Sequence, residues 1–227
     1  MIEVLFMITS AMLLLKVGVP QKEARRRCVL CLAMWVGKTP ATRKKENPNL
    51  VLYVMPPIIT KEYPHFFTVT NLEWKRLLKP DKYKDIIIAS MRFLVEDKRI
   101  KIFSFVIMEN HIHLIWQMLA NNNQEAVQRD FLKYTAQRIK EDLEKKHPAV
   151  LLHFKVNAKD RKYQFWERNA LSVELRNHEV FIQKLDYIHW NPVQAGICKL
   201  PEEYKYSSAL FYETGIDNWG FLSHYRD

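Results

Sequence analysis

The stretch Ile107-Met108-Glu109-Asn110-His111-Ile112-His113-Leu114-Ile115-Trp116 predicts the centre of the fold. The residues just before it, 100–106, are mostly β-branched or aromatic, which is typical of a strand. Glu109-Asn110 reads as a tight turn, and residues 112–118 read as a second strand. The stretch is therefore predicted to form a β-hairpin.

Two histidines alternate with apolar residues in this hairpin. Because side chains of a strand alternate between faces, His111 and His113 project from one face. The other face, carrying Ile112, Leu114 and Trp116, points into a core. Two imidazoles about 7 Å apart along a strand can converge on one divalent ion. Taken alone, the pair is read equally well as two strand histidines that make ordinary hydrogen bonds.

The second informative stretch is Leu185-Asp186-Tyr187-Ile188-His189-Trp190-Asn191-Pro192-Val193-Gln194-Ala195-Gly196, at the end of a helix predicted over 177–194. Tyr187 and Asn191 are four residues apart, so they share a helix face. Pro192 disfavours helical geometry at Asn191, which predicts that the helix frays there. Taken alone, Tyr187 reads as a core tyrosine with a hydrogen-bonded hydroxyl, and Tyr134 is a second tyrosine on a predicted helix.

Together these stretches resemble the single-tyrosine HUH transposases of the IS200-like group. The run 187–196, followed by Pro201 to Ala209, is similar to the REP-associated tyrosine transposase branch, and the resemblance covers roughly residues 64–211. The family usually has Pro-Asn or Pro-Glu in the turn where this chain has Glu109-Asn110.

The resemblance implies a site, a cofactor and a reaction. Tyr187 would be the nucleophile, and His111, His113 and Asn191 would hold Mg²⁺ or Mn²⁺. The substrate would be single-stranded DNA, hairpin-containing in this branch, nicked and rejoined through a 5′-phosphotyrosine intermediate. The protein would act as a monomer or a homodimer.

The order of predicted elements gives the fold class. A strand over 65–71, a helix over 81–97, the hairpin and a helix over 124–146 are followed by short strands over 151–156 and 163–166. This order is βαββαβ, an α+β ferredoxin-like sandwich with an antiparallel sheet. The resemblance implies the same architecture, with an added C-terminal helix that carries Tyr187.

The bulk composition favours a nucleic-acid partner. The 227 residues are 48% hydrophobic and include six tryptophans, which excludes a wholly disordered protein. The net charge of +10 points to a polyanion, nucleic acid before an anionic membrane. Three cysteines fit a reducing cytoplasm. Cys28 and Cys31 form a C-x-x-C, but no second pair follows at zinc-finger spacing.

Residues 1–60 are predicted to be a basic N-terminal extension, and residues 61–227 the IS200-like domain. Residues 1–19 are apolar but shorter than a membrane span, so no membrane anchor is expected. Residues 21–47 hold eight basic and two acidic side chains, a net charge of +6, which suits either a solvated arm or DNA phosphates. The candidate DNA-binding residues are Arg25, Arg26, Arg27, Arg43, Lys44, Lys45, Lys133 and Arg138.

The leading prediction is thus a cytoplasmic, metal-dependent transposase. One alternative is a domesticated, non-catalytic DNA- or RNA-binding module on the same scaffold. Another is an unrelated metal hydrolase that uses the two histidines, a class that generally recruits further His, Asp or Glu ligands. Among the aromatics, Trp190, Trp166 and Phe165 are candidates for stacking on unpaired bases.

Overall fold

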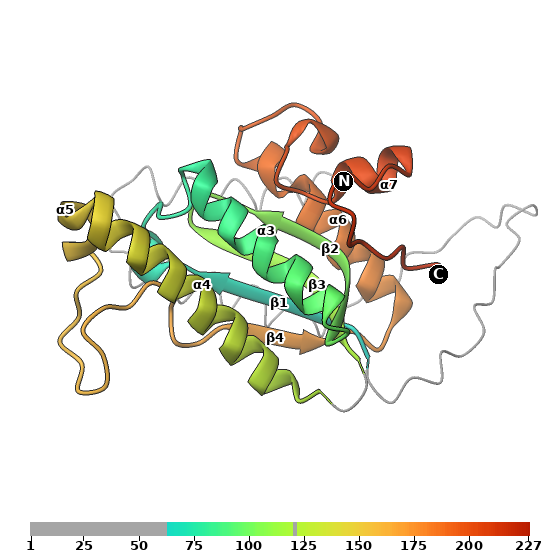
Figure 1. The fold of residues 1–227 in the computed structure, drawn as a ribbon. Coiled ribbons are helices and arrows are strands. Elements are labelled where there is room, and N and C mark those ends of the chain that lie inside the picture. Colours follow the sequence, from blue (N-terminus) through green and yellow to red (C-terminus); the bar gives the residue numbers. More distant parts are fainter. Residues whose placement is uncertain (1–62, 120–121) are drawn as a thin grey trace, which may run out of the picture. The chain divides into compact units, whose positions relative to one another are not determined.

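The computed structural model describes residues 63–119 and 122–227 (Figure 1). The predictions for the basic segment and for the Cys28-Cys31 pair lie outside these residues. No helix in the described ranges is both long enough and apolar enough to span a bilayer.

Four strands and five α-helices make up the described chain. The strands are β1 His65–Thr70, β2 Ile100–Ile107, β3 His111–Met118 and β4 Leu171–Glu174. The α-helices are α3 Asp81–Glu96, α4 Gln124–Lys146, α5 Pro148–Leu152, α6 His178–Gln194 and α7 Ala209–Thr214. Two short 3₁₀ helices, η2 Leu72–Trp74 and η3 Pro201–Glu203, complete the set.

The strands form one antiparallel sheet in the order β2-β3-β1-β4. This is the strand order of a βαββαβ ferredoxin-like sandwich, so the predicted fold class is confirmed. The register places Thr70 opposite His111 and Thr68 opposite His113. The two histidines therefore lie on a central strand, each beside a threonine of β1.

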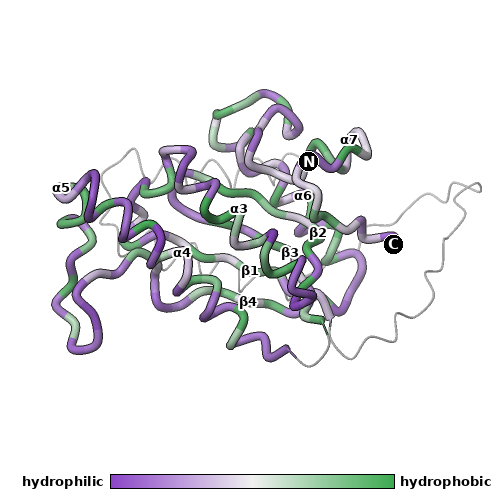
Figure 2. Tube along the Cα trace, in the orientation of Figure 1, coloured by the Kyte–Doolittle hydropathy of each residue, from purple (hydrophilic) through white to green (hydrophobic). Residues whose placement is uncertain are grey.

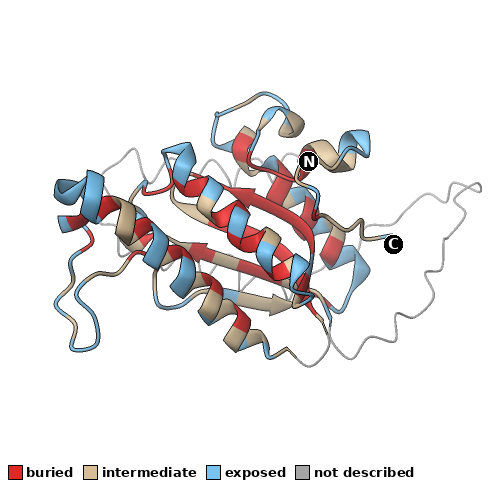
Figure 3. Cartoon of the chain, viewed as in Figure 1, coloured by how far each residue is buried: buried red, intermediate tan, exposed pale blue. Residues whose placement is uncertain are grey.

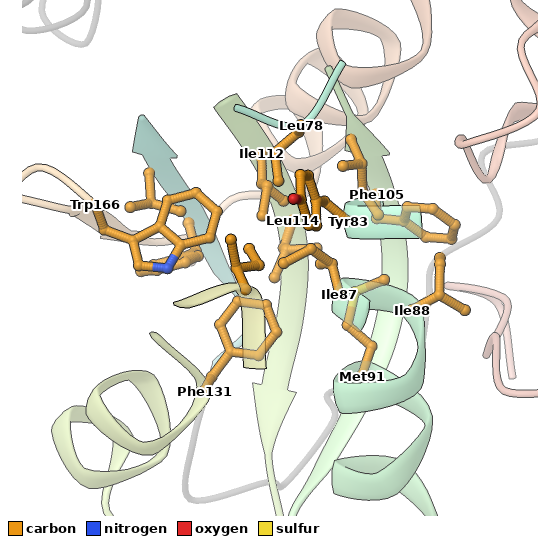
Figure 4. Close-up of a cluster of buried hydrophobic side chains, with 14 of the residues drawn as sticks. Leu78, Tyr83, Ile87, Ile88, Met91, Phe105, Ile112, Leu114, Phe131 and Trp166 are labelled. Atoms are coloured by element: carbon orange, nitrogen blue, oxygen red, sulfur yellow. The ribbon is translucent and has the colours of Figure 1, made fainter. Parts of the chain in front are cut away.

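Helices α3 and α4 cover one face of the sheet (Figure 1). Their buried side chains, among them Ile87, Met91 and Phe131, point toward Ile112 and Leu114 of β3 (Figure 4). Figure 3 shows burial concentrated on the central strands and on the inward sides of both helices. Figure 2 shows the matching pattern, with many hydrophilic residues along α4 and hydrophobic residues along the strands. The apolar side of the hairpin thus lies in the core, as predicted.

Helix α6 covers the opposite face of the sheet, behind it in Figure 1. Leu185 and Ile188 are buried, and the ring of Phe181 packs edge-on against Phe103 of β2 at 5.8 Å. The side chain of Asn177 caps the helix, accepting from the backbone N–H of Glu179 at 2.7 Å. Anchored this way, α6 lies over the strand face from which the histidines project.

The fourth strand is not where the sequence predicted it. Residues 148–152 form the short helix α5 with a proline at its first turn, a position that suits proline. The rings of Phe154 and Phe165 pack against each other in the core, tilted, with centroids 5.2 Å apart, and Lys155 and Tyr163 form only an isolated bridge. The strand that completes the sheet is β4, which pairs with β1 at its edge. Short apolar runs fit a helix or a strand equally well, which explains the error.

The predicted fraying at Pro192 is also wrong, since α6 continues through it to Gln194. Gly196, which follows the C-cap residue Ala195, has a φ of 70°. The backbone N–H of Ile197 donates to the carbonyl of Pro192, and that of Gly196 to Val193, both at 2.9 Å. This is the Schellman pattern. Asn191 is therefore held in a regular helical turn.

Candidate active site

The β2–β3 turn aims the histidines at α6. The N–H of Met108 donates to the carbonyl of His111 at 2.8 Å, which closes the Glu109-Asn110 turn. Pairing with β2 and β1 on either side then holds β3 in place. The positions of the two imidazoles are thus set by the centre of the sheet and not by a loop.

His113 is the more buried of the two histidines, with 4% of the residue exposed. Its Nδ1 lies 2.7 Å from Oγ1 of Thr68, and its ring stacks on Phe66 at 5.6 Å. Its Nε2 is buried and has no hydrogen-bond partner among the described residues. Burial, aided by His111 and the charge of Lys184, holds the pKa of His113 well below its usual range. The imidazole is therefore neutral, with its ring orientation set by Thr68.

Both nitrogens of His111 face amide oxygens. Nδ1 lies 2.7 Å from Oδ1 of Asn110, and Nε2 lies 3.2 Å from Oδ1 of Asn191. Burial lowers the pKa of His111 to about 4, against a smaller opposing effect of Asn191, so the ring is neutral near pH 7. A neutral imidazole has one N–H and one lone pair. Only one of the two ring nitrogens can therefore donate to its amide oxygen. With both amides oriented as observed, the other nitrogen turns its lone pair toward an oxygen.

Helix α6 adds Tyr187 to this cluster. Its ring centroid lies 5.1 Å from that of His113, and the two histidine rings are 4.7 Å apart. The ring of Phe66 adjoins both, stacked on His113 and edge-on to Tyr187 at 6.1 Å. The four predicted site residues, His111, His113, Tyr187 and Asn191, are therefore neighbours in space.

Lys184 is a site neighbour that the sequence analysis missed. It is only 9% exposed, and its Nζ lies 4.9 Å from the ring centre of Phe66 and 5.8 Å from that of Tyr187. Burial lowers its pKa. Its position three residues before Tyr187 was the available signal, because such residues share a helix face.

Trp74 is the second residue that was missed. It follows β1 in η2, is 38% exposed, and lies 6.1 Å from the ring of His111. Glu73 and Trp74 have φ of 55° and 59°, a left-handed conformation that costs a non-glycine residue about 1–2 kcal/mol. No sequence pattern signals such a conformation at a Glu-Trp pair.

The other predicted residues lie away from this cluster or outside the described ranges. Lys133, Tyr134 and Arg138 are exposed on α4, which covers the opposite face of the sheet, and Arg138 pairs with Glu141 at 2.8 Å. Trp166 and Phe165 are buried in the core, whereas Trp190 is 47% exposed on α6. The arm residues are not described: Arg25, Arg26, Arg27, Arg43, Lys44 and Lys45.

The cluster is a two-histidine, one-amide set. Across the described ranges, no three or more His, Cys, Asp or Glu side chains gather in a way that suits a metal ion. The candidate ligands here are thus two imidazole nitrogens and one amide oxygen, with a tyrosine beside them.

A curated relative and a solved structure resemble this chain. A Haemophilus influenzae protein, provisionally named a REP-associated tyrosine transposase, is 26% identical over 150 residues, which cover 66% of this chain and 81% of that protein. The solved structure of a REP-associated tyrosine transposase bound to a REP hairpin aligns with a TM-score of 0.52 at 18% identity, over 73% of this chain and 88% of that one. No family model matches the chain.

Proposed function

We propose that this chain, which is related in sequence and in fold to the REP-associated tyrosine transposases, is a transposase that nicks and rejoins single-stranded DNA. The relation supports a DNA-processing enzyme of the transposase type. The finer parts of the proposal are the divalent metal, the covalent tyrosine intermediate and a hairpin-containing substrate. The solved relative is bound to a REP hairpin, which supports a DNA partner of that kind.

One observation carries the proposal: two elements distant in the sequence converge. β3 supplies two imidazoles, and α6 supplies a phenol 5.1 Å from His113 and an amide oxygen 3.2 Å from His111. A core tyrosine would not need a buried histidine nitrogen beside it that lacks a hydrogen-bond partner, yet Nε2 of His113 has none within the described ranges. The arrangement favours a nucleophile beside a cation site.

The residues fit a divalent cation. With the proton of His111 on Nδ1, facing Oδ1 of Asn110, its Nε2 lone pair faces the oxygen of Asn191. The Nε2 of His113 is buried without a hydrogen-bond partner among the described residues, so a cation would satisfy all three atoms. Two ligand atoms at about 2.1 Å from an octahedral ion, such as Mg²⁺, lie about 3 Å apart, close to the observed 3.2 Å. When bound, the ion would neutralise charge on the attacked phosphate.

In the proposed reaction, the chain supplies the nucleophile. The Tyr187 oxygen attacks phosphorus, its proton passes to water, and the bond from phosphorus to the 3′-oxygen breaks. The products are a 5′-phosphotyrosine and a DNA strand whose 3′-oxygen takes up a proton. Attack by a 3′-hydroxyl then reverses the exchange and releases Tyr187, so the strand is rejoined without a nucleotide cofactor.

The non-catalytic binding module is not favoured. Such a module needs neither a buried imidazole nitrogen without a hydrogen-bond partner nor a tyrosine beside it, and the described part of the chain has both. The hydrolase alternative depends on further His, Asp or Glu ligands, and within the described residues no such group is found.

The test is an adduct assay. The full chain is incubated with labelled single-stranded DNA that carries the hairpin flanking its own gene, plus Mg²⁺ or Mn²⁺, and run on a denaturing gel. We expect a labelled protein band that disappears in Tyr187→Phe, because the ring stays but the attacking oxygen is gone. Peptide mass after nuclease trimming should place the adduct on Tyr187.

Tyr134→Phe is the matched control, since it removes the same atom from an exposed tyrosine on the other face of the sheet. The adduct should persist in it. A full adduct in Tyr187→Phe, or an adduct mapped to Tyr134, would contradict the assignment.

A further inference from the structure

We infer that Trp74 is a stacking platform for an unpaired base of the bound strand, next to the phosphate that Tyr187 attacks. The inference rests on the proposed function, because it places the strand at the His111–Tyr187 cluster. Trp74 would be a contact to the DNA that is separate from the candidate metal ligands and the nucleophile.

Trp74 lies in a strained stretch of backbone. Glu73 and Trp74 are consecutive non-glycine residues, and both adopt the left-handed conformation that favours glycine. Such strain persists only where neighbouring contacts enforce it, and it clusters at ligand-binding sites.

Two contacts hold this segment from outside, and one ion pair lies within it. The N–H of Glu73 donates to the carboxylate of Glu167 at 2.9 Å, and the Glu73 carboxylate pairs with Lys75 at 2.9 Å. The N–H of Leu72 donates to the carbonyl of Phe165 at 2.8 Å. The backbone just before Trp74 is thus held in place, while the Trp74 residue remains more than one-third exposed.

Asn110 connects Trp74 to the site. Its Nδ2 donates to the carbonyl of Trp74 at 3.4 Å, and its Oδ1 lies 2.7 Å from Nδ1 of His111. The indole is itself 6.1 Å from the imidazole of His111, edge-on. The backbone of Trp74 is therefore tied to the candidate metal ligand through Asn110, and the indole lies beside that ligand, where a platform for the neighbouring base is needed.

One exposed guanidinium close to Trp74 in the chain is available to a phosphate. Arg76, two residues on, has a 71% exposed side chain, 3.5 Å from the carboxylate of Glu109. An exposed aromatic with an adjacent guanidinium is the combination that binds single strands, the ring stacking on a base and the cation meeting the backbone. Because every base has a π-face, this contact would favour unpaired bases without selecting one.

The experiment compares two DNA probes that share a sugar-phosphate backbone, one with bases and one without. Fluorescence anisotropy measures binding of the full chain, in EDTA to prevent cleavage, to labelled dT15 and to a 15-unit abasic strand. We expect Trp74→Ala to weaken binding of dT15 by about 5- to 150-fold, the range for loss of one stacked base, and to leave the abasic strand unaffected. Trp74→Tyr should restore most of the loss.

Trp74→Leu, which keeps apolar bulk without a π-face, should behave like Trp74→Ala. Phe93→Ala is the matched control, since Phe93 is 59% exposed on α3, across the sheet from the site. Equal weakening for both probes, or no rescue by tyrosine, would overturn the inference.

The adduct assay separates this inference from the proposed function. A Tyr187 adduct in the wild-type chain, together with unchanged dT15 binding in all Trp74 variants, overturns the platform alone. Base-dependent weakening in Trp74→Ala without any adduct overturns the transposase chemistry and supports the platform.

Discussion

The Nε2 atom of His111 and the Oδ1 atom of Asn191 lie 3.2 Å apart although 80 positions separate the two residues in the chain. His111 is placed by a central strand, and Asn191 by the last turn of a helix that packs across it. Their spacing is therefore determined by how α6 packs on the sheet. Changes in that packing should affect the site before they affect the fold.

The first prediction concerns Thr68, which orients His113 through the 2.7 Å contact to Nδ1. Thr68→Val keeps the shape of the side chain and removes the hydroxyl. We expect Mn²⁺ affinity, measured by calorimetry without DNA, to fall about 10- to 100-fold, the usual effect of losing a group that orients a ligand.

The neighbouring Thr70 is the control for this prediction. It lies opposite His111 on the same strand face as Thr68, and no hydrogen bond of its side chain to a histidine is found in the described structure. Thr70→Val should bind Mn²⁺ like the wild type. If both valine variants bind Mn²⁺ normally, the orienting role of Thr68 is wrong.

The central part of the fold could be predicted because its residues follow simple periodicities. Alternation in 111–116 separates His111 and His113 from Ile112, and four-residue spacing joins Tyr187 to Asn191. Both patterns depend only on local geometry. The position of each residue on its element was therefore predictable from sequence.

The parts that could not be predicted depend on tertiary contacts. β4 is a four-residue edge strand whose pairing with β1 determines its conformation, and its own composition is a weak signal. The left-handed conformation of Trp74 likewise depends on contacts with segments far away in sequence. For Lys184, the sequence indicates the helix face shared with Tyr187, but its burial depends on the packing of α6 on the sheet.

The second prediction concerns the basic segment 21–47. Deleting the residues before Lys61 should flatten the salt dependence of single-stranded DNA binding. The slope of log K against log salt should lose up to about 0.7 for each phosphate contact removed. A truncated chain with an unchanged slope would show that the segment does not contact DNA.

The third prediction compares two helix ends of the same type. After α3, the N–H of Lys98 donates to Val95 and that of Arg99 to Leu94, both at 3.0 Å, so Lys98 occupies the position that Gly196 has after α6. Lys98 has a φ of 56° and is exposed. Lys98→Gly should therefore stabilise the protein by about 1 kcal/mol, by removing strain.

Gly196→Ala provides the reverse test. An added Cβ would contact nothing within 4 Å, so any effect comes from its φ of 70° alone. Chemical denaturation should show a loss of about 1 kcal/mol. The two substitutions should change the free energy of unfolding in opposite directions. A Lys98→Gly protein less stable than the wild type would contradict the strain at Lys98.

The last prediction concerns stability in acid, where α3 and α4 meet at Asp142. Its carboxylate is 17% exposed and accepts hydrogen bonds from Lys82 and, at 2.9 Å, from the hydroxyl of Tyr83. The hydrogen bond from Lys82 is the largest effect that holds the pKa of Asp142 below its usual 3.8, with Tyr83 and Lys146 adding to it and burial opposing it.

A carboxyl group with a lowered pKa in the folded state stabilises the fold at pH values above its unfolded pKa. That contribution is lost as the pH falls below about 4 toward the lower folded pKa. Asp142→Asn should therefore lower the free energy of unfolding by about 1 kcal/mol at pH 7, a modest value because Lys82 is partly exposed. Below about pH 4 the difference between the two proteins should shrink as the pH falls. Denaturation curves of both proteins from pH 7 to pH 2 measure this difference. A constant gap down to pH 2 would mean that the ionised carboxylate is not what stabilises the contact between α3 and α4.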